Sequence, residues 1–172
     1  ECGERGEAAV LLCYALGKAQ RVLAELQRLG EPPAWLHGAV ANGVVVYREA
    51  GIDMLETHTV AEQGREPDAG GKLIIAPPSA AGTTWLRRFG KHQLGFASGW
   101  MRLRGNRRRR RNYDRGFVIS DHADWPALLQ TIEQTGASRV IATHGNTDAL
   151  IPFLRERGVA AEAFRTDFGG EE

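Results

Sequence analysis

Apolar positions along this chain follow two patterns that alternate. Continuous apolar runs at residues 8–14 and 73–76 predict strands that are covered on both faces. Between them, residues 18–29 carry apolar side chains at helical spacing, and Gly30 with the prolines after it ends the predicted helix. This alternation predicts an α/β fold with a mostly parallel sheet flanked by helices.

The same alternation continues along the rest of the chain. It predicts strands at 35–36, 93–97, 117–119, 140–142 and 161–164, and helices at 84–89, 125–135 and 147–157. Residues 39–50 are ambiguous, because 47–50 favour a helix while Gly43 and three consecutive valines oppose one. The loop at 105–112 is the natural boundary between a first segment, 1–112, and a second, 113–172. The second segment holds too few strands for a core of its own.

The composition is that of a globular protein and excludes several classes. Of 172 residues, 42% are hydrophobic and 25% are charged, and no apolar stretch approaches the roughly 20 residues of a membrane span. The polar first residues contain no apolar core of a signal peptide. Two cysteines are too few for a disulfide framework or a four-cysteine zinc site. We therefore expect a cytoplasmic protein without membrane contact.

A net charge of +1 conceals a concentrated basic segment. Residues 87–115 hold eleven Lys and Arg residues and one acid, so this segment carries +10 and the remainder −9. This concentration predicts contact with a polyanion, since arginine pairs with phosphate through two parallel hydrogen bonds. The residues expected to contact nucleic acid are Arg104, Arg107, Arg108, Arg109, Arg110 and Arg111, with Lys18 at a predicted helix start. A solvated loop without a partner, or a localisation signal, is the alternative.

Two polar motifs follow predicted strands. Ser120-Asp121-His122-Ala123-Asp124 comes after one strand, and Thr143-His144-Gly145 comes after the next. If these strands are parallel neighbours, about 4.8 Å apart, both imidazoles can reach one metal ion or phosphate at the carboxyl edge of the sheet. Asp121 and Asp124 can orient His122, as carboxylates beside an imidazole often do. The alternative is that Asp124 only caps its helix and both histidines satisfy backbone groups.

Several familiar motifs are absent from the sequence. Gly17-Lys18 lacks the other residues of a P-loop, and no GxGxxG follows the first strand, which disfavours a nucleotide-binding small-molecule enzyme. The two histidines belong to no HExxH or CxxC pattern. The other histidines, His37, His58 and His92, stand at unrelated positions. Because a zinc site normally takes three or four protein ligands, any metal site in this chain is incomplete.

Six short motifs together resemble the metallo-β-lactamase/β-CASP nucleases, in particular the ligase-associated DNA exonucleases, also described as mRNA 3′-end processing exonuclease-like proteins. The motifs are Tyr14–Arg21 (YALGKAQR), Ile75–Ser79 (IAPPS), Ala97–Met101 (ASGWM), Tyr113–Phe117 (YDRGF), Ser120–Trp125 (SDHADW) and Thr143–Gly145 (THG). They extend over nearly the whole chain and are specific in combination, because each alone is weak.

The resemblance implies a β-CASP-type α/β region at 1–112 and the returning C-terminal segment of a metallo-β-lactamase αββα domain at 113–172. It implies that His122 contacts the scissile phosphate and protonates the leaving oxygen, and that His144 ligates one of two zinc ions. Those ions would generate a hydroxide and stabilise the pentacoordinate phosphate. The implied partners are DNA or RNA, the other half of the metallo-β-lactamase domain, and an ATP-dependent DNA ligase system.

The chain departs from that family in its zinc ligands. The family's HxHxDH motif and its further ligands would precede the position that corresponds to Glu1. His144 alone cannot hold two zinc ions, so we expect negligible nuclease activity from these 172 residues by themselves. A non-catalytic α/β module that binds nucleic acid through its arginine-rich loop is the alternative.

Overall fold

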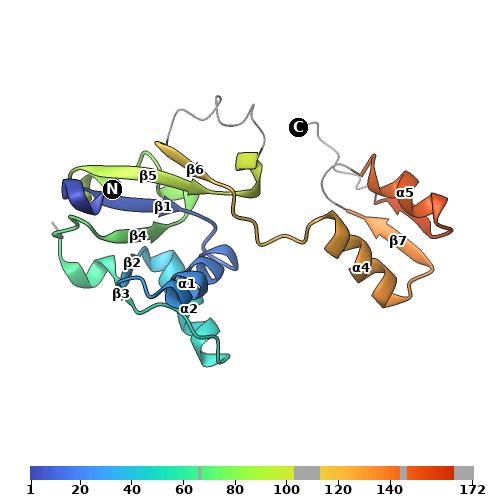
Figure 1. The fold of residues 1–172 in the computed structure, drawn as a ribbon, viewed down its shortest axis with the longest axis horizontal. Helices are drawn as coiled ribbons and strands as arrows, with labels where there is room; N and C mark the ends of the chain where they lie inside the picture. The colour runs from blue at the N-terminus through green and yellow to red at the C-terminus, as the bar shows by residue number, and fades with distance from the viewer. Residues whose placement is uncertain (66, 103–112, 144–146, 165–172) are drawn as a thin grey trace. The chain divides into compact units, whose positions relative to one another are not determined.

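A computed structural model describes residues 1–65, 67–102, 113–143 and 147–164 (Figure 1). The chain divides into two compact units, Glu1–Asp121 and His122–Glu172. This boundary lies later than the division expected after residue 112, because the strand that follows the arginine-rich loop joins the sheet of the first unit. The assignment of 1–112 and 113–172 to two domain types stays a prediction.

The first unit is built on a six-stranded sheet whose pairings are all parallel. Its strands lie in the order β3-β2-β4-β1-β5-β6, so β1 and β4 are central. The strands are β1 (Ala8–Leu12), β2 (Ala34–Leu36), β3 (Thr57–Thr59), β4 (Leu73–Ala76), β5 (His92–Ala97) and β6 (Arg115–Phe117). The predicted α/β class with a mostly parallel sheet flanked by helices is therefore confirmed.

Two helices and several single turns connect these strands. The helices are α1 (Lys18–Leu29) and α2 (Gly38–Glu49), and the 3₁₀ turns are η1 (Gly3–Arg5), η2 (Val60–Gln63), η3 (Pro78–Ala80), η4 (Leu86–Phe89) and η5 (Gly99–Arg102). α1 has the predicted bounds, since Gly30 turns left-handed (φ 70°) and its amide closes the last turn. The predicted helix at 84–89 is wrong, because only the four-residue 3₁₀ turn η4 forms there, and it begins at Leu86.

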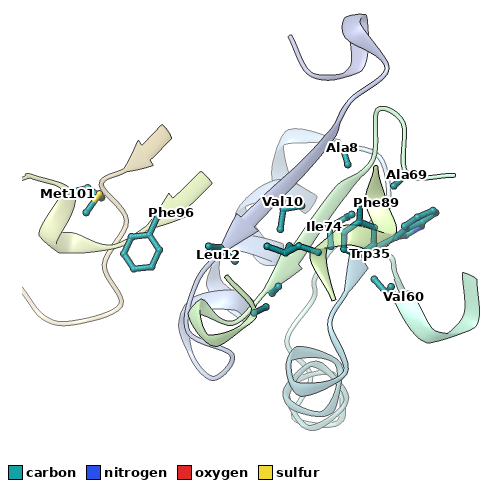
Figure 2. Close-up of a cluster of buried hydrophobic side chains, with 13 residues drawn as sticks. Ala8, Val10, Leu12, Trp35, Val60, Ala69, Ile74, Phe89, Phe96 and Met101 are labelled. Carbon is teal, nitrogen blue, oxygen red and sulfur yellow. The ribbon is translucent and has the colours of Figure 1, made fainter. Parts of the chain in front are cut away.

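The core of the first unit lies on both faces of the sheet. One cluster, drawn in Figure 2, combines Val10, Leu12 and Ile74 of the central strands with Phe89 of η4 and Met101 of η5. The other face is covered by α1 and α2, which bury Leu23 and Val44 against residues such as Ile75 of β4. Burial on both faces explains why the central strands are continuous apolar runs in the sequence.

The ambiguous segment 39–50 is helical because tertiary packing overrides its weak propensity. Val40 and Val44 are one turn apart and both are buried, while Val45 and Val46 are exposed. Gly43 permits a close approach of α2 to α1, since a Cβ there would lie 2.7 Å from Nε2 of the Gln20 side chain. The residue that opposed a helix on propensity thus leaves room for the Gln20 side chain.

The second unit contains α4 (Trp125–Thr135), β7 (Arg139–Ala142), α5 (Leu150–Glu156) and β8 (Ala160–Ala163). β7 and β8 form a separate two-stranded parallel sheet. β6 pairs with β5, and β7 pairs with β8, so the expectation that the strands before His122 and His144 are neighbours in one sheet stays a prediction. Hydrophobic pattern identifies strands but carries no information on which strands pair.

Of the two helices in the second unit, α4 has the bounds predicted from the sequence and α5 does not. α4 begins after Asp124, as predicted, and ends at Gly136 in a left-handed conformation. The helix predicted at 147–157 is shorter, since α5 begins at Leu150 without a side-chain cap. Across the described ranges, no helix is long and apolar enough to cross a lipid bilayer.

Candidate functional site

The carboxyl ends of the strands in the first unit share one edge of the sheet, because all their pairings are parallel. This edge is where open α/β sheets bind ligands. β1 leads to Gly17 and Lys18, β5 leads to Ser98, and β6 leads to Ser120 and Asp121. Three of the motifs singled out in the sequence therefore follow strands that are neighbours in the sheet.

A buried ion pair joins two of these motifs. The Lys18 side chain is only 2% exposed, and its Nζ lies 3.1 Å from Oδ1 of Asp121, whose side chain is 25% exposed. The Lys18 ammonium also lies 4.8 Å from the ring centre of Tyr14, where the π-electrons attract a cation. A charge this deeply buried is stable only when it is paired, so Asp121 holds Lys18 in place and Lys18 holds Asp121.

The start of α1 reinforces this contact through its backbone. Gly17 has a φ of 81°, and a Cβ at this position would lie 3.0 Å from Oδ2 of Asp121. One turn later, Arg21 donates a hydrogen bond to the backbone carbonyl of Ser120. Residues 17–21 thus fix both Ser120 and Asp121, which immediately precede His122 in the sequence.

The loop after β5 also contacts the segment that follows β6, which is the neighbouring strand. Ser98 is buried, its amide donates to the Phe117 carbonyl at 3.0 Å, and its hydroxyl accepts from the Trp100 amide at 3.3 Å. A Cβ at Gly99 would lie 3.2 Å from the Cβ of Ser120. Loops after two strands, β1 and β5, therefore determine the position of residues 120–121.

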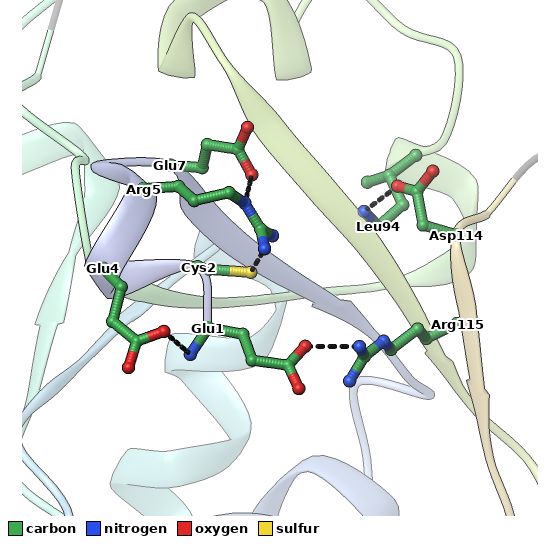
Figure 3. Close-up of polar contacts among 8 residues, drawn as sticks. All are labelled: Glu1, Cys2, Glu4, Arg5, Glu7, Leu94, Asp114 and Arg115. Carbon is green, nitrogen blue, oxygen red and sulfur yellow. Dashed lines mark hydrogen bonds and ion pairs between the residues drawn. The ribbon is translucent and has the colours of Figure 1, made fainter.

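β6 is joined to the rest of the unit by polar contacts near its start (Figure 3). Asp114 accepts from the Leu94 amide through Oδ2 at 2.7 Å, and its own amide donates to the Leu94 carbonyl at 2.8 Å. Arg115 forms an ion pair with Glu1. These contacts align β6 on β5 and so direct the chain toward the carboxyl edge.

Cys13 follows β1 at the same edge but is not a candidate nucleophile or metal ligand. Its side chain is fully buried, and this burial raises the pKa of the thiol to about 12, although the Lys18 charge acts in the opposite direction. At neutral pH the sulfur therefore keeps its proton, and a thiol in this state reacts poorly with electrophiles and metals.

The predicted catalytic residues separate into distinct roles. Asp121 is paired with Lys18, as described above. Asp124 caps α4, because its Oδ1 accepts from the Ala127 amide at 2.9 Å. This cap was the alternative considered from the sequence, and a catalytic role for Asp124 stays a prediction. His122 is the first residue of the second unit, and its role also stays a prediction.

Lys18 has a different environment from the one expected of a residue that contacts nucleic acid. Its ammonium faces Asp121 inside the protein, whereas the sequence indicated a cation available at a helix start. One sequence signal could have pointed to burial of Lys18, namely the apolar run of residues 8–14 shortly before it. It contains no signal for the partner, because Asp121 lies about a hundred positions further along the chain.

The remaining predicted site residues lie outside the described residues. These are His144, the expected zinc ligand, and Arg104, Arg107, Arg108, Arg109, Arg110 and Arg111, the expected nucleic-acid contacts. Within the described ranges, no group of three or more His, Cys, Asp or Glu side chains is arranged to hold a metal ion. The described residues alone therefore do not fit a zinc site.

Comparison with known proteins shows a sequence similarity between this chain and part of a longer protein. No family model matches the chain. It is similar to part of a "Probable DNA ligase" from Opitutus terrae. The two are 32% identical over 161 residues, which is 92% of this chain but 15% of the relative. The chain thus spans about one seventh of the length of that protein.

Proposed function

We propose that this chain is part of a nucleic-acid phosphodiesterase, of the zinc-dependent exonuclease type that its motifs resemble. The observation that carries the proposal is the buried pair of Lys18 and Asp121 at the carboxyl edge of the sheet. Burying the Lys18 charge is costly, and here its ion pair holds the residue directly before His122. The similarity to part of a probable DNA ligase supports a setting in which nucleic acid is processed.

In this proposal His122 acts on the scissile phosphate. A protonated imidazole can stabilise the negative phosphate as a cation and give its proton to the leaving oxygen. Lys18 and Arg21 hold residues 120–121, which directly precede His122, and so limit the positions that the His122 backbone can take. We therefore assign positioning roles to both residues. The loop after β5 restricts the same segment.

A zinc site would need residues that lie outside the described ranges. His144 is its one proposed ligand in this chain, and further ligands have to come from another segment or another chain. Bound zinc would supply a Lewis acid and a hydroxide nucleophile. The DNA or RNA substrate, the other half of the metallo-β-lactamase domain, and a DNA ligase system are the proposed partners.

A second candidate function is non-catalytic binding of nucleic acid. It is favoured by the charge of +10 over residues 87–115, since such a segment attracts a phosphate backbone without any need for a catalytic site. Both candidates predict binding that weakens steeply with salt. Only the first predicts cleavage of the bound strand.

The deciding experiment begins with the coding DNA upstream of the Glu1 codon. If an HxHxDH motif is encoded in frame, the longer protein should cleave end-labelled DNA or RNA, and a chelator should abolish this cleavage. His122→Ala should lower the cleavage rate about 100-fold or more. His58→Ala is the matched control, because His58 is half exposed on β3, at the far side of the sheet from β6.

The outcomes separate the two candidates. If the longer protein binds nucleic acid in a salt-dependent way but shows no metal-dependent cleavage, the exonuclease proposal is contradicted. Non-catalytic binding of nucleic acid then stays as the proposed function. Equal cleavage by the His122 and His58 variants would contradict the role of His122, and absence of both binding and cleavage would contradict both candidates.

A further inference from the structure

A second basic feature lies at the opposite, amino edge of the sheet. A hollow of about 640 Å³ is formed by the loops that precede three adjacent strands, β4, β1 and β5. Its basic lining residues are Arg65, Arg87, Arg88 and Lys91. Arg87, Arg88 and Lys91 lie in the basic segment 87–115, but none of the four residues belongs to the carboxyl-edge site or to the consecutive arginines of the sequence.

Basic side chains outnumber acidic ones among the described residues that line this hollow. Asp68 is the one acid among the described lining residues, and its Oδ1 accepts from the Gly70 amide. Arg65, Arg87 and Lys91 are exposed, and no salt bridge involves them within the part of the chain that the structure describes. Arg88 is half-buried and donates to the Gly64 carbonyl, which joins the two loops.

The shape and composition of the hollow favour one class of ligand. Guanidinium groups match phosphate oxygens geometrically, and several cations around a concavity concentrate the positive potential. Phe89, the aromatic residue of the lining, is 5% exposed and packed in the core, so it offers no surface on which a base could stack. The hollow is therefore suited to a phosphate backbone rather than to bases.

We propose that this amino-edge hollow is a second nucleic-acid contact surface, which binds the phosphate backbone without regard to sequence. The proposal rests on the proposed function in that it takes nucleic acid as the ligand of the protein. β5 is six residues long, so the two edges are separated by about 20 Å along the strands. A nucleic acid of a few tens of nucleotides is long enough to contact both edges.

The test measures how strongly binding depends on salt. The probe is a fluorescent single-stranded DNA of about 30 nucleotides, titrated with the 172-residue chain between about 50 and 300 mM NaCl. The double variant Arg87→Gln/Lys91→Gln should bind about tenfold more weakly at the lowest salt. Its log–log salt slope should be smaller by about 1.4, since each lost phosphate contact on a single strand contributes about 0.7.

The control variant, Arg28→Gln/Arg157→Gln, removes the same charge from other surfaces. Arg28 lies on α1 and Arg157 follows α5, and both are exposed. This control should bind within about twofold of the unchanged chain, because neither residue lines the hollow. Thermal unfolding followed by circular dichroism checks that both variants are folded.

Each result bears on a different claim. Equal slopes for the two double variants would overturn the amino-edge surface and leave the proposed function intact. No salt-dependent binding by the unchanged chain would contradict the proposed function itself. If polyglutamate displaces the DNA at equal charge concentration, and this displacement is lost in the Arg87→Gln/Lys91→Gln variant, the surface binds acidic polypeptides and the nucleic-acid assignment is overturned.

Discussion

The two units of this protein differ in how much apolar surface they bury. In the first unit both faces of the central strands are covered, and residues such as Leu23 and Ile74 are completely inaccessible. In the second unit only Leu154 and Ala161 are buried hydrophobic residues among those described, and α4 buries none. The first unit therefore carries its own core, and equal substitutions in the two units should have unequal consequences.

The largest difference is expected for leucine-to-alanine substitutions in the helices. Leu23→Ala in α1 should lower the free energy of unfolding by about 3 kcal/mol, because it leaves a cavity at a fully buried position. Leu128→Ala in α4 should lower it by about 0.5 kcal/mol, since this side chain is 36% exposed. Urea unfolding of both variants measures the two values, and equal losses would refute the contrast between the units.

A smaller loss is expected when the buried ion pair is broken. Lys18→Met removes the ammonium that lies 3.1 Å from the Asp121 carboxylate, and partial exposure of Asp121 limits the cost to about 2 kcal/mol. The double variant Lys18→Met/Asp121→Asn should recover part of this stability. Lys72→Met, at an exposed position, should change it by less than about 0.5 kcal/mol. If Lys18→Met and Lys72→Met are equally stable in urea, the pair contributes nothing.

The cap of α4 tests whether the second unit unfolds independently. Asp124→Ala removes the acceptor of the Ala127 amide and should cost about 1 kcal/mol, whereas Asp124→Asn retains a capping side chain. Hydrogen exchange should become faster in α4 (Trp125–Thr135) and stay unchanged in α1. Faster exchange in both helices would show that the two units are coupled.

The smallest effect is a pH dependence at His37, which caps α2. Its Nδ1 accepts from the Ala39 amide at 3.1 Å, its ring packs edge-on against Trp85, and burial lowers the pKa of the imidazole below its ordinary value of 6.5. The unfolded chain therefore binds this proton more readily, so stability is lost as the pH falls below about 6.5.

After allowance for solvent screening, this loss is less than about 0.5 kcal/mol between pH 7.5 and 5.5. His37→Asn keeps a capping side chain but cannot titrate in this range, so urea unfolding of this variant should lack that part of the pH dependence. Identical pH profiles for the two proteins would exclude His37 as the source.

Local signals predicted most of the fold, and long-range pairing is what they could not supply. The bounds of α1 followed from apolar spacing and Gly30, and the start of α4 followed from Asp124 and the proline after it. α2 remained ambiguous, because the approach of the Gln20 side chain to Gly43 appears only in the folded structure. The expected pairing of the strands before the two histidines stays a prediction.

The candidate site was predictable only in part. The sequence located the motif at 120–124 and its position after a strand, and it gave the capping of α4 by Asp124 as one alternative. It did not show that Lys18 is buried or that Asp121 is its partner. Such a pair depends on the order of strands in the sheet, which no local pattern in either segment encodes.

The contacts that close the carboxyl edge also have a consequence for synthesis and folding. Arg21 and Ser120 are 99 residues apart, so α1 emerges from the ribosome roughly 5 to 20 s before its partners at usual elongation rates. During this interval the Lys18 ammonium has no Asp121 to neutralise it and stays hydrated. The contacts of Lys18 and Arg21 with residues 120–121 therefore form only after β6 has been added, which makes them a late step in a non-local folding reaction.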